Sequence, residues 1–182
     1  DSGNLVQFAV MGQIFARLVL NLKRPTVGLL NVGSEEQKGH EELREASAIL
    51  RQIDLPMEFI GFVEGDDITA GTVDVIVTDG FSGNIALKAA EGTSRMFTFF
   101  LKEAFGSSIY SKIGYVLSKT AINQVRERMD PRKYNGAVFL GLNGIAVKSH
   151  GSTDSFGFAN AIGVAADMSK YGFLDKVKDA DE

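Results

Sequence analysis

The chain has 182 residues, 45% of them hydrophobic and 23% charged, and its 19 basic and 23 acidic residues give a formal net charge of −4. This composition is typical of one globular domain or of a large part of a bigger one, and the negative charge argues against a general nucleic-acid-binding protein. The absence of cysteine excludes disulfides and an acyl-cysteine intermediate and fits a cytoplasmic protein, and no apolar run reaches the roughly 18 residues of a membrane-spanning helix.

The first predicted elements are a helix, a strand and a second helix. Residues 5–20 (LVQFAVMGQIFARLVL) are apolar nearly all round, which indicates a buried helix. Residues 26–33 form a short apolar run that ends at Gly33, which indicates a buried strand. Residues 35–53 carry apolar side chains at helical spacing and predict an amphipathic helix.

The same patterns predict seven further elements: strands over 57–63 and 73–80, helices over 83–104, 108–129 and 154–170, and two short strands over 136–151 around the tight-turn dipeptide Asn143-Gly144. Alternating strands and helices predict an α/β fold with a mostly parallel sheet. The acidic tail, residues 175–182, is expected to fray and is given no function. The chain begins without an initiator methionine, so 1–182 is expected to be either a single α/β domain or the C-terminal portion of a larger enzyme.

Polar stretches follow three of the predicted strands: NVGSEEQKG (31–39), TDGFSGN (78–84) and KSHGSTDS (148–155). Ligands of open α/β sheets bind at the carboxyl ends of the strands, and backbone N–H groups at helix starts favour an anion such as phosphate. The alternative is that these residues only make turns and helix caps. We expect loops 31–39, 78–84 and 148–154 to converge on one pocket.

The candidate site residues come from these loops. The candidate binding residues are Asn31, Gly33, Ser34, Glu35, Lys38, Gly39, Gly80, Phe81, Ser82, Gly83, Asn84, Lys148, Gly151, Ser152 and Asp154. The candidate catalytic residues are Asp79, Lys88 and His150, with a helix cap, a solvated lysine and a turn-stabilising histidine as the respective alternatives. If Gly83 begins the helix, Asn84 lies in its first turn and Lys88 one turn later. Two histidines are too few for a His-rich zinc site, and no metal or cofactor is expected.

Residues 96–133 predict a helical projection with an unusual surface. Six aromatic residues crowd between 97 and 115, and residues 102–133 carry seven basic against three acidic residues. Apolar groups beside cations suit a dimer interface, an acidic protein partner or a membrane surface, and these three alternatives stay open.

Several stretches in one order resemble the PlsX family of phosphate acyltransferases: LVQFAVMG, VGLLNVGSEEQKG, DGFSGNIALKAAEG and YNGAVFLGLNGIAVKSHGSTDS. The resemblance covers about residues 5–170 and implies the C-terminal half or so of a typical member. It implies a three-layer α/β/α fold, similar to isocitrate/isopropylmalate dehydrogenases and phosphotransacetylase, and a homodimer.

The resemblance also implies a reaction. Inorganic phosphate would attack the thioester of an acyl-acyl carrier protein and form acyl phosphate for bacterial phospholipid synthesis, in a cytoplasmic enzyme with peripheral membrane contact. The alternatives are a phosphotransacetylase-like enzyme that uses acyl-CoA and a non-catalytic module that binds carrier protein or membrane. A decarboxylating dehydrogenase is less favoured, because paired aspartates for a divalent metal are not evident in the three loops.

Overall fold

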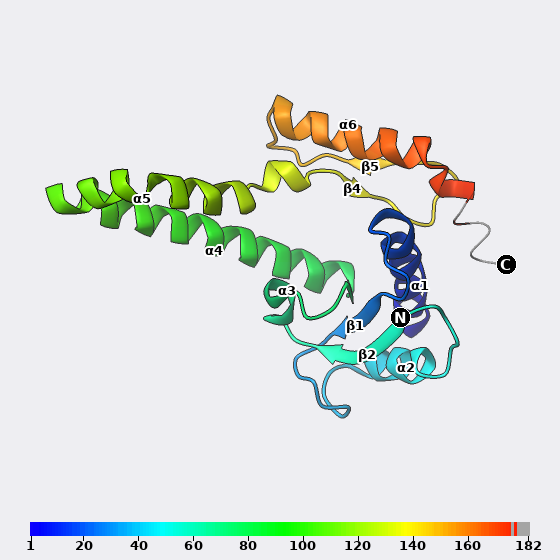
Figure 1. Cartoon of the computed structure of the whole chain (residues 1–182). Helices are drawn as coiled ribbons and strands as arrows, with labels where there is room; N and C mark the ends of the chain where they lie inside the picture. Colours follow the sequence, from blue (N-terminus) through cyan, green and yellow to red (C-terminus); the bar gives the residue numbers. More distant parts are fainter. Residues whose placement is uncertain (176, 178–182) are drawn as a thin grey trace. The chain divides into compact units, whose positions relative to one another are not determined.

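A computed structural model describes residues 1–175 and 177, and its helices and strands alternate as the sequence pattern predicts (Figure 1). Contacts divide the chain into two compact units. The first comprises Asp1–Gly83, Phe139–Ala146 and the segment from Ala166 onwards, and the second comprises Asn84–Val138 and Val147–Ala165. Across the described residues, no helix is both long and apolar enough to cross a membrane. Most of the acidic tail, 175–182, lies outside the described residues.

A small parallel sheet forms the centre of the first unit. Its strands are β1 (Thr26–Leu30), β2 (Glu58–Val63) and β3 (Val75–Val77), in the order β2-β1-β3. Both neighbouring pairs are parallel, which agrees with the long crossovers between the strands. The predicted α/β class with a parallel sheet is therefore confirmed at the level of a mixed α/β unit with three strands.

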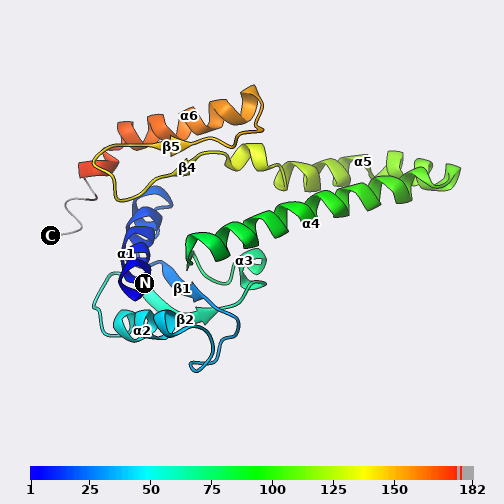
Figure 2. The same cartoon turned by 180° about the vertical axis from the view of Figure 1, so that it is seen from behind.

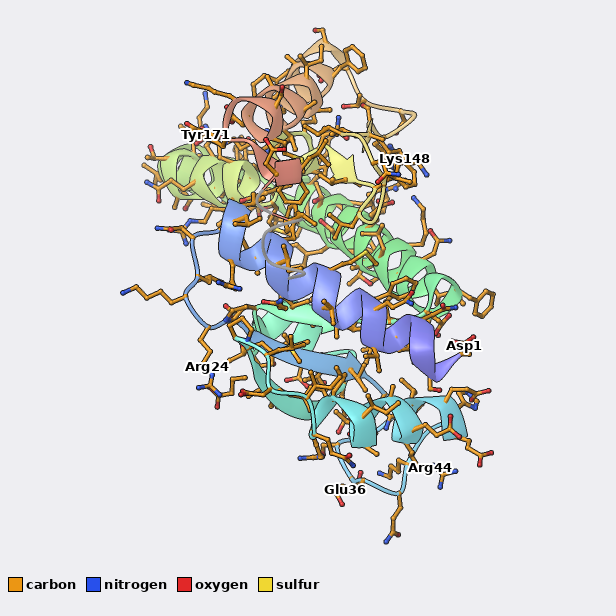
Figure 3. All side chains as sticks on the ribbon, turned by 90° about the vertical axis from the view of Figure 1, so that its right-hand side faces the viewer. Asp1, Arg24, Glu36, Arg44, Lys148 and Tyr171 are labelled. Carbon is orange, nitrogen blue, oxygen red and sulfur yellow. The ribbon has the colours of Figure 1, made fainter. Side chains whose placement is uncertain are left out.

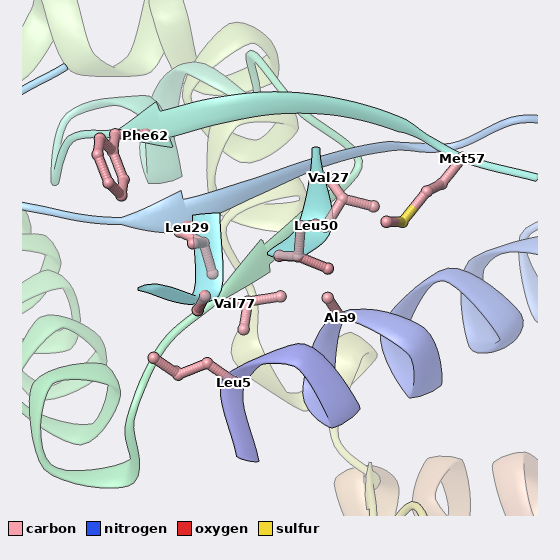
Figure 4. Packing of buried hydrophobic residues seen from close by; sticks show 9 residues of the cluster. Leu5, Ala9, Val27, Leu29, Leu50, Met57, Phe62 and Val77 are labelled. Carbon is pink, nitrogen blue, oxygen red and sulfur yellow. The ribbon is translucent and has the colours of Figure 1, made fainter. Parts of the chain in front are cut away.

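Helices α1 (Ser2–Val19) and α2 (Glu41–Leu50) supply further side chains of this core, together with Met57 just before β2 (Figure 4). Leu29 and Leu50 are at most 2% exposed, and burial of each such side chain stabilises the fold by about 1.5–3 kcal/mol. Charged side chains lie outside this core, and those of Glu36 and Arg44 point away from the sheet (Figure 3).

The second helix of the first unit begins later than the sequence predicts. It starts at Glu41 rather than at residue 35, and residues 34–40 form a loop. The reason is Gly39, whose φ of 86° is left-handed and interrupts a right-handed helix. The one-turn helix α3 (Asp67–Ala70) is also absent from the prediction.

Two long helices that follow one another in the chain dominate the second unit (Figures 1 and 2). They are α4 (Gly80–Gly106) and α5 (Ile109–Arg128), and neither contains a buried residue. The helix predicted over 108–129 is confirmed, with Ser108 accepting a capping hydrogen bond from the N–H of Ser111 at 3.0 Å. The first of the pair begins at Gly80, so the predicted start at Gly83 is wrong by three residues.

The remaining elements are the 3₁₀ helix η1 (Pro131–Tyr134), the antiparallel strands β4 (Ala137–Val138) and β5 (Val147–Lys148), and helix α6 (Ser155–Lys170). The two short strands are confirmed. A tight turn at Asn143-Gly144 is not, because residues 139–146 separate the strands and belong to the first unit.

Candidate functional site

A buried amide closes the loop after β1. Asn31 is 7% exposed; its Oδ1 accepts a hydrogen bond from the N–H of Val32 at 2.8 Å, and its Nδ2 donates to the carbonyl oxygen of Lys38 at 3.0 Å. Gly39 lies directly against this amide, and a Cβ atom there would collide with the Asn31 side chain. Both predicted site residues therefore hold the loop in shape.

The charged side chains of this loop are paired with one another. Lys38 Nζ lies 2.8 Å from Glu35 Oε1, and both side chains are more than half exposed. The hydrogen bond to Lys38 lowers the pKa of Glu35, and the same bond raises the pKa of Lys38. The N–H of Ser34 donates to Glu64 Oε1 at 3.1 Å. An anion that bound here would compete with both glutamates for these donors.

Asp79 caps helix α4. Its Oδ1 accepts hydrogen bonds from the N–H groups of Phe81 and Ser82, each at 2.9 Å. The side chain and the backbone N–H of Ser82 hold the pKa of the Asp79 carboxyl below its ordinary value. Two N–H groups that the sequence offers to a phosphate are thus already satisfied by this carboxylate.

The first two loops leave the same edge of the sheet. Strands β1 and β3 are parallel neighbours, so loops 31–39 and 78–83 follow carboxyl ends that lie side by side. Gly83 approaches this edge closely, because a Cβ atom there would lie 2.7 Å from Cγ2 of Thr78. Loop 148–154 belongs to the second unit, and its convergence with the other two stays a prediction.

A buried asparagine organises the third loop within the second unit. Asn135 is 8% exposed, and its Oδ1 accepts from the N–H of His150 at 2.9 Å. Its Nδ2 donates to Ser149 Oγ at 2.9 Å and to the carbonyl oxygen of Gly157 at 2.7 Å. One side chain therefore joins the loop after β5 to the first turn of α6.

The contacts of His150 fix its tautomer. The N–H of Ser152 points at His150 Nδ1 at 3.3 Å, and Ser152 Oγ lies 3.0 Å from the same nitrogen. A backbone N–H can only donate, so Nδ1 of the neutral ring is the acceptor and the proton is on Nε2. The predicted residues His150 and Ser152 are thus brought into direct contact.

Nε2 of His150 faces a carboxylate on α4. Glu91 Oε1 lies 3.8 Å from it, while Glu91 Oε2 lies 2.9 Å from Lys88 Nζ and 3.1 Å from Arg95 Nη2. The hydrogen bond from Lys88 is the largest cause of a lowered pKa of Glu91. The Lys88 side chain is 53% exposed and forms this ion pair within its own helix.

Asp154 belongs to a network of hydrogen bonds and ion pairs with Arg132 and Asp130 at the start of α6. Its Oδ1 accepts from the N–H of Gly157 at 3.0 Å, and its Oδ2 lies 2.8 Å from Arg132 Nη1. The N–H of Gly157, followed by Arg132, lowers the pKa of Asp154. Arg132 also binds Asp130 at 2.7 Å and holds the pKa of that carboxyl at about 2.

Comparisons with known proteins identify the family. The sequence model of a family described as "Fatty acid synthesis protein" matches residues 1–176. The chain belongs to this family. It is similar to proteins named "Phosphate acyltransferase" from Rhodospirillum centenum (63% identical), Paramagnetospirillum magneticum (60%) and Rhodospirillum rubrum (57%). Each match covers 98% of this chain and 50 or 51% of the relative, so the chain spans about half the length of these relatives. The resemblance to the PlsX phosphate acyltransferases is confirmed.

In this member of the fatty acid synthesis protein family, the predicted site residues divide between the two units. The first unit holds Asn31, Gly33, Ser34, Glu35, Lys38, Gly39, Asp79, Gly80, Phe81, Ser82 and Gly83, and the second holds Asn84, Lys88, Lys148, His150, Gly151, Ser152 and Asp154. Sequence reasoning missed Glu91 and Asn135, whose contacts join distant segments. Helical spacing from Lys88 to Glu91 and Arg95 was the one available signal for the glutamate.

Proposed function

We propose that the protein containing this chain transfers a fatty acyl group from acyl-acyl carrier protein to inorganic phosphate. The observation that carries the proposal is 60–63% identity, over 98% of the chain, to proteins named "Phosphate acyltransferase". Because the chain spans only half of those relatives, the activity is proposed for the whole protein. The acyl phosphate product would supply phospholipid synthesis.

The proposed reaction needs no nucleophile from the protein. An oxygen of phosphate forms a bond to the thioester carbonyl carbon, the carbon–sulfur bond breaks, and the carrier thiolate leaves and takes up a proton. The protein must bind phosphate in line with the carbonyl and stabilise the oxyanion that develops. A chain without cysteine is compatible with this chemistry.

Side chains of the second unit are proposed to bind and orient the reactants. Asn84 and Lys88 lie four residues apart on α4, so they share one side of the helix and can both donate to one anion. His150 carries its hydrogen on Nε2 and is proposed to donate a hydrogen bond from Nε2 to the sulfur of the leaving thiolate, which takes up its proton from water. Ser152 and Lys148 of the same loop are proposed as further phosphate donors.

The capped start of α4 changes the role proposed for loop 78–83. Since Asp79 already accepts from the N–H groups of Phe81 and Ser82, and the Ser82 side chain also bonds this carboxylate, a ligand at this loop would compete with Asp79 for these donors. In loop 31–39, the donors proposed for an anion are Lys38, in competition with Glu35, and the backbone of Gly33 and Ser34, where Glu64 already accepts from the N–H of Ser34.

The architecture and partners of the whole protein follow from the same proposal. We propose a three-layer α/β/α fold for the full length, a cytoplasmic homodimer and peripheral contact with the membrane. The apolar side chains of α4 and α5 support an intermolecular role, because Phe97, Phe99 and Phe100 are each more than half exposed.

One assay tests the proposed function. The full-length protein is incubated with phosphate and a long-chain acyl-acyl carrier protein, and in parallel with phosphate and the corresponding acyl-CoA, and acyl phosphate is measured. We expect product from the carrier-bound substrate. Product from acyl-CoA alone would instead support a phosphotransacetylase-like enzyme, and no product from either would support a binding module.

A further inference from the structure

Glu91 is the meeting point of three basic side chains in the second unit. Lys88 and Arg95 approach its Oε2 at 2.9 and 3.1 Å from the same helix, and His150 approaches its Oε1 at 3.8 Å from the loop after β5. The side chain of Glu91 is 23% exposed, against 53% for Lys88 and 76% for Arg95. The carboxylate is therefore the most enclosed group of the cluster.

The cluster keeps a net positive charge and unused donors. Lys88 and Arg95 carry two charges against the single charge of Glu91, and protonation of His150 would add a third. A lysine has three N–H donors and an arginine has five, and one of each is used here on the carboxylate. The remaining donors are available to an anionic ligand.

We propose that Glu91 is a positioning residue that aims Lys88 at the phosphate and His150 at the leaving group. This inference rests on the proposed acyl transfer to phosphate. A carboxylate that contacts both basic groups restricts their orientation before the ligand binds, which reduces the ordering cost of binding. Glu91 Oε1 also lies 3.8 Å from Nε2 of His150, in a loop 59 positions later in the chain, so α4 and this loop place their donors near one another.

Glu91 could instead weaken phosphate binding by neutralising a basic side chain, and this alternative makes the positioning role testable. If Glu91 only neutralises Lys88, its removal would raise the net positive charge and strengthen phosphate binding. If Glu91 positions Lys88, its removal leaves a mobile, exposed ammonium group and weakens phosphate binding. The two roles therefore predict opposite changes in the phosphate KM.

The experiment compares Glu91→Gln with the matched control Glu103→Gln in the full-length protein. Glu103 is an exposed glutamate of the same helix, so both substitutions remove one negative charge from α4. We expect Glu91→Gln to raise the phosphate KM about three- to five-fold, the size of effect that an exposed ion pair supports, with little change for the acyl substrate. Glu103→Gln should leave both KM values within about two-fold, as is typical of a surface substitution.

A double-mutant cycle with Lys88→Ala shows whether Glu91 acts through the lysine. We expect Glu91→Gln to have no further effect on the phosphate KM once Lys88 is absent, because the two changes remove the same interaction. Three results would overturn the positioning role. The phosphate KM of Glu91→Gln could be lower than that of the unmodified protein, or equal to that of Glu103→Gln. Alternatively, Glu91→Gln could raise the phosphate KM by the same factor with and without Lys88.

A second measurement does not depend on turnover. In the NMR spectrum of the full-length protein, the Lys88 ammonium and His150 ring signals should shift in Glu91→Gln and not in Glu103→Gln. Unchanged signals would overturn the proposal. If the unmodified protein forms no acyl phosphate, the proposed function itself is refuted. If it is active and Glu91→Gln leaves the phosphate KM unchanged, only the positioning role is refuted.

Discussion

At the scale of single residues, two aspartates predicted as site residues act as helix caps. Asp79 accepts from two N–H groups at the start of α4, and Asp154 accepts from the N–H of Gly157 at the start of α6. These three bonds satisfy backbone donors that the first turn of a helix leaves unpaired. The pKa of Asp79 is lowered by the side chain and then the N–H of Ser82, and the pKa of Asp154 is lowered first by the N–H of Gly157. A capping role explains these aspartates without a catalytic one.

Substitution of Asp79 separates capping from chemistry. Asp79→Ala should lower the free energy of unfolding by about 1 kcal/mol, whereas Asp79→Asn should preserve it, because asparagine caps as well as aspartate. The control is Asp66→Ala: Asp66 precedes α3 but makes no side-chain capping bond. Urea unfolding measures the stability. If Asp79→Asn keeps its stability but forms no acyl phosphate, the carboxylate has a chemical role and capping alone is an insufficient account.

The ion pair between Arg132 and Asp130 predicts that the stability of the fold depends on pH. Arg132 holds the pKa of Asp130 at about 2, below the ordinary value of 3.8, so the folded state releases this proton more readily than the unfolded state. The resulting stabilisation is present above about pH 4 and is lost as the pH falls towards 2. Asp130→Asn should therefore be less stable than the unmodified chain at pH 6, and the difference should shrink at pH 3. A difference that is the same at both pH values would contradict this account.

At the scale of elements, the hydrophobic pattern predicted the strands and most helices, but it misplaced the starts of three helices. Helix α1 begins at Ser2 rather than at residue 5. The predicted helix included residues 35–40, yet Gly39 is left-handed against the Asn31 amide and α2 begins at Glu41. Helix α4 starts three residues early because Asp79 caps it. The shifts of α2 and α4 each depend on a side-chain contact that the hydrophobic periodicity does not contain.

Helix α5 carries an apolar stripe that its own unit leaves exposed. Ile109, Ile113, Val116 and Leu117 recur at helical spacing, and Leu117 is 81% exposed. If this stripe is the proposed dimer contact, Leu117→Asp should lower the dimer fraction in sedimentation experiments without unfolding the chain. The matched control is Ser118→Asp, an equal charge change at the next exposed position. Equal sedimentation of the two variants would exclude Leu117 from the contact.

At the scale of the whole molecule, the family was accessible from the sequence but the contacts within its site were not. Several motifs in one order indicated the PlsX phosphate acyltransferases, and the family match over residues 1–176 confirms this. In contrast, Asn135 contacts His150, and His150 faces Glu91, across 15 and 59 positions of the chain. Pairs so far apart are set by the tertiary fold, so local spacing could not predict them.

The central claim, that phosphate itself attacks the acyl group, can be tested with isotopically labelled phosphate. Phosphate carrying ¹⁸O at all four positions is supplied with acyl-acyl carrier protein to the full-length protein, and the acyl phosphate is analysed by mass spectrometry. Direct attack retains all four labelled oxygens, because the new carbon–oxygen bond uses an oxygen of phosphate. Acyl phosphate with three labelled oxygens, or none formed at all, would contradict the proposed reaction.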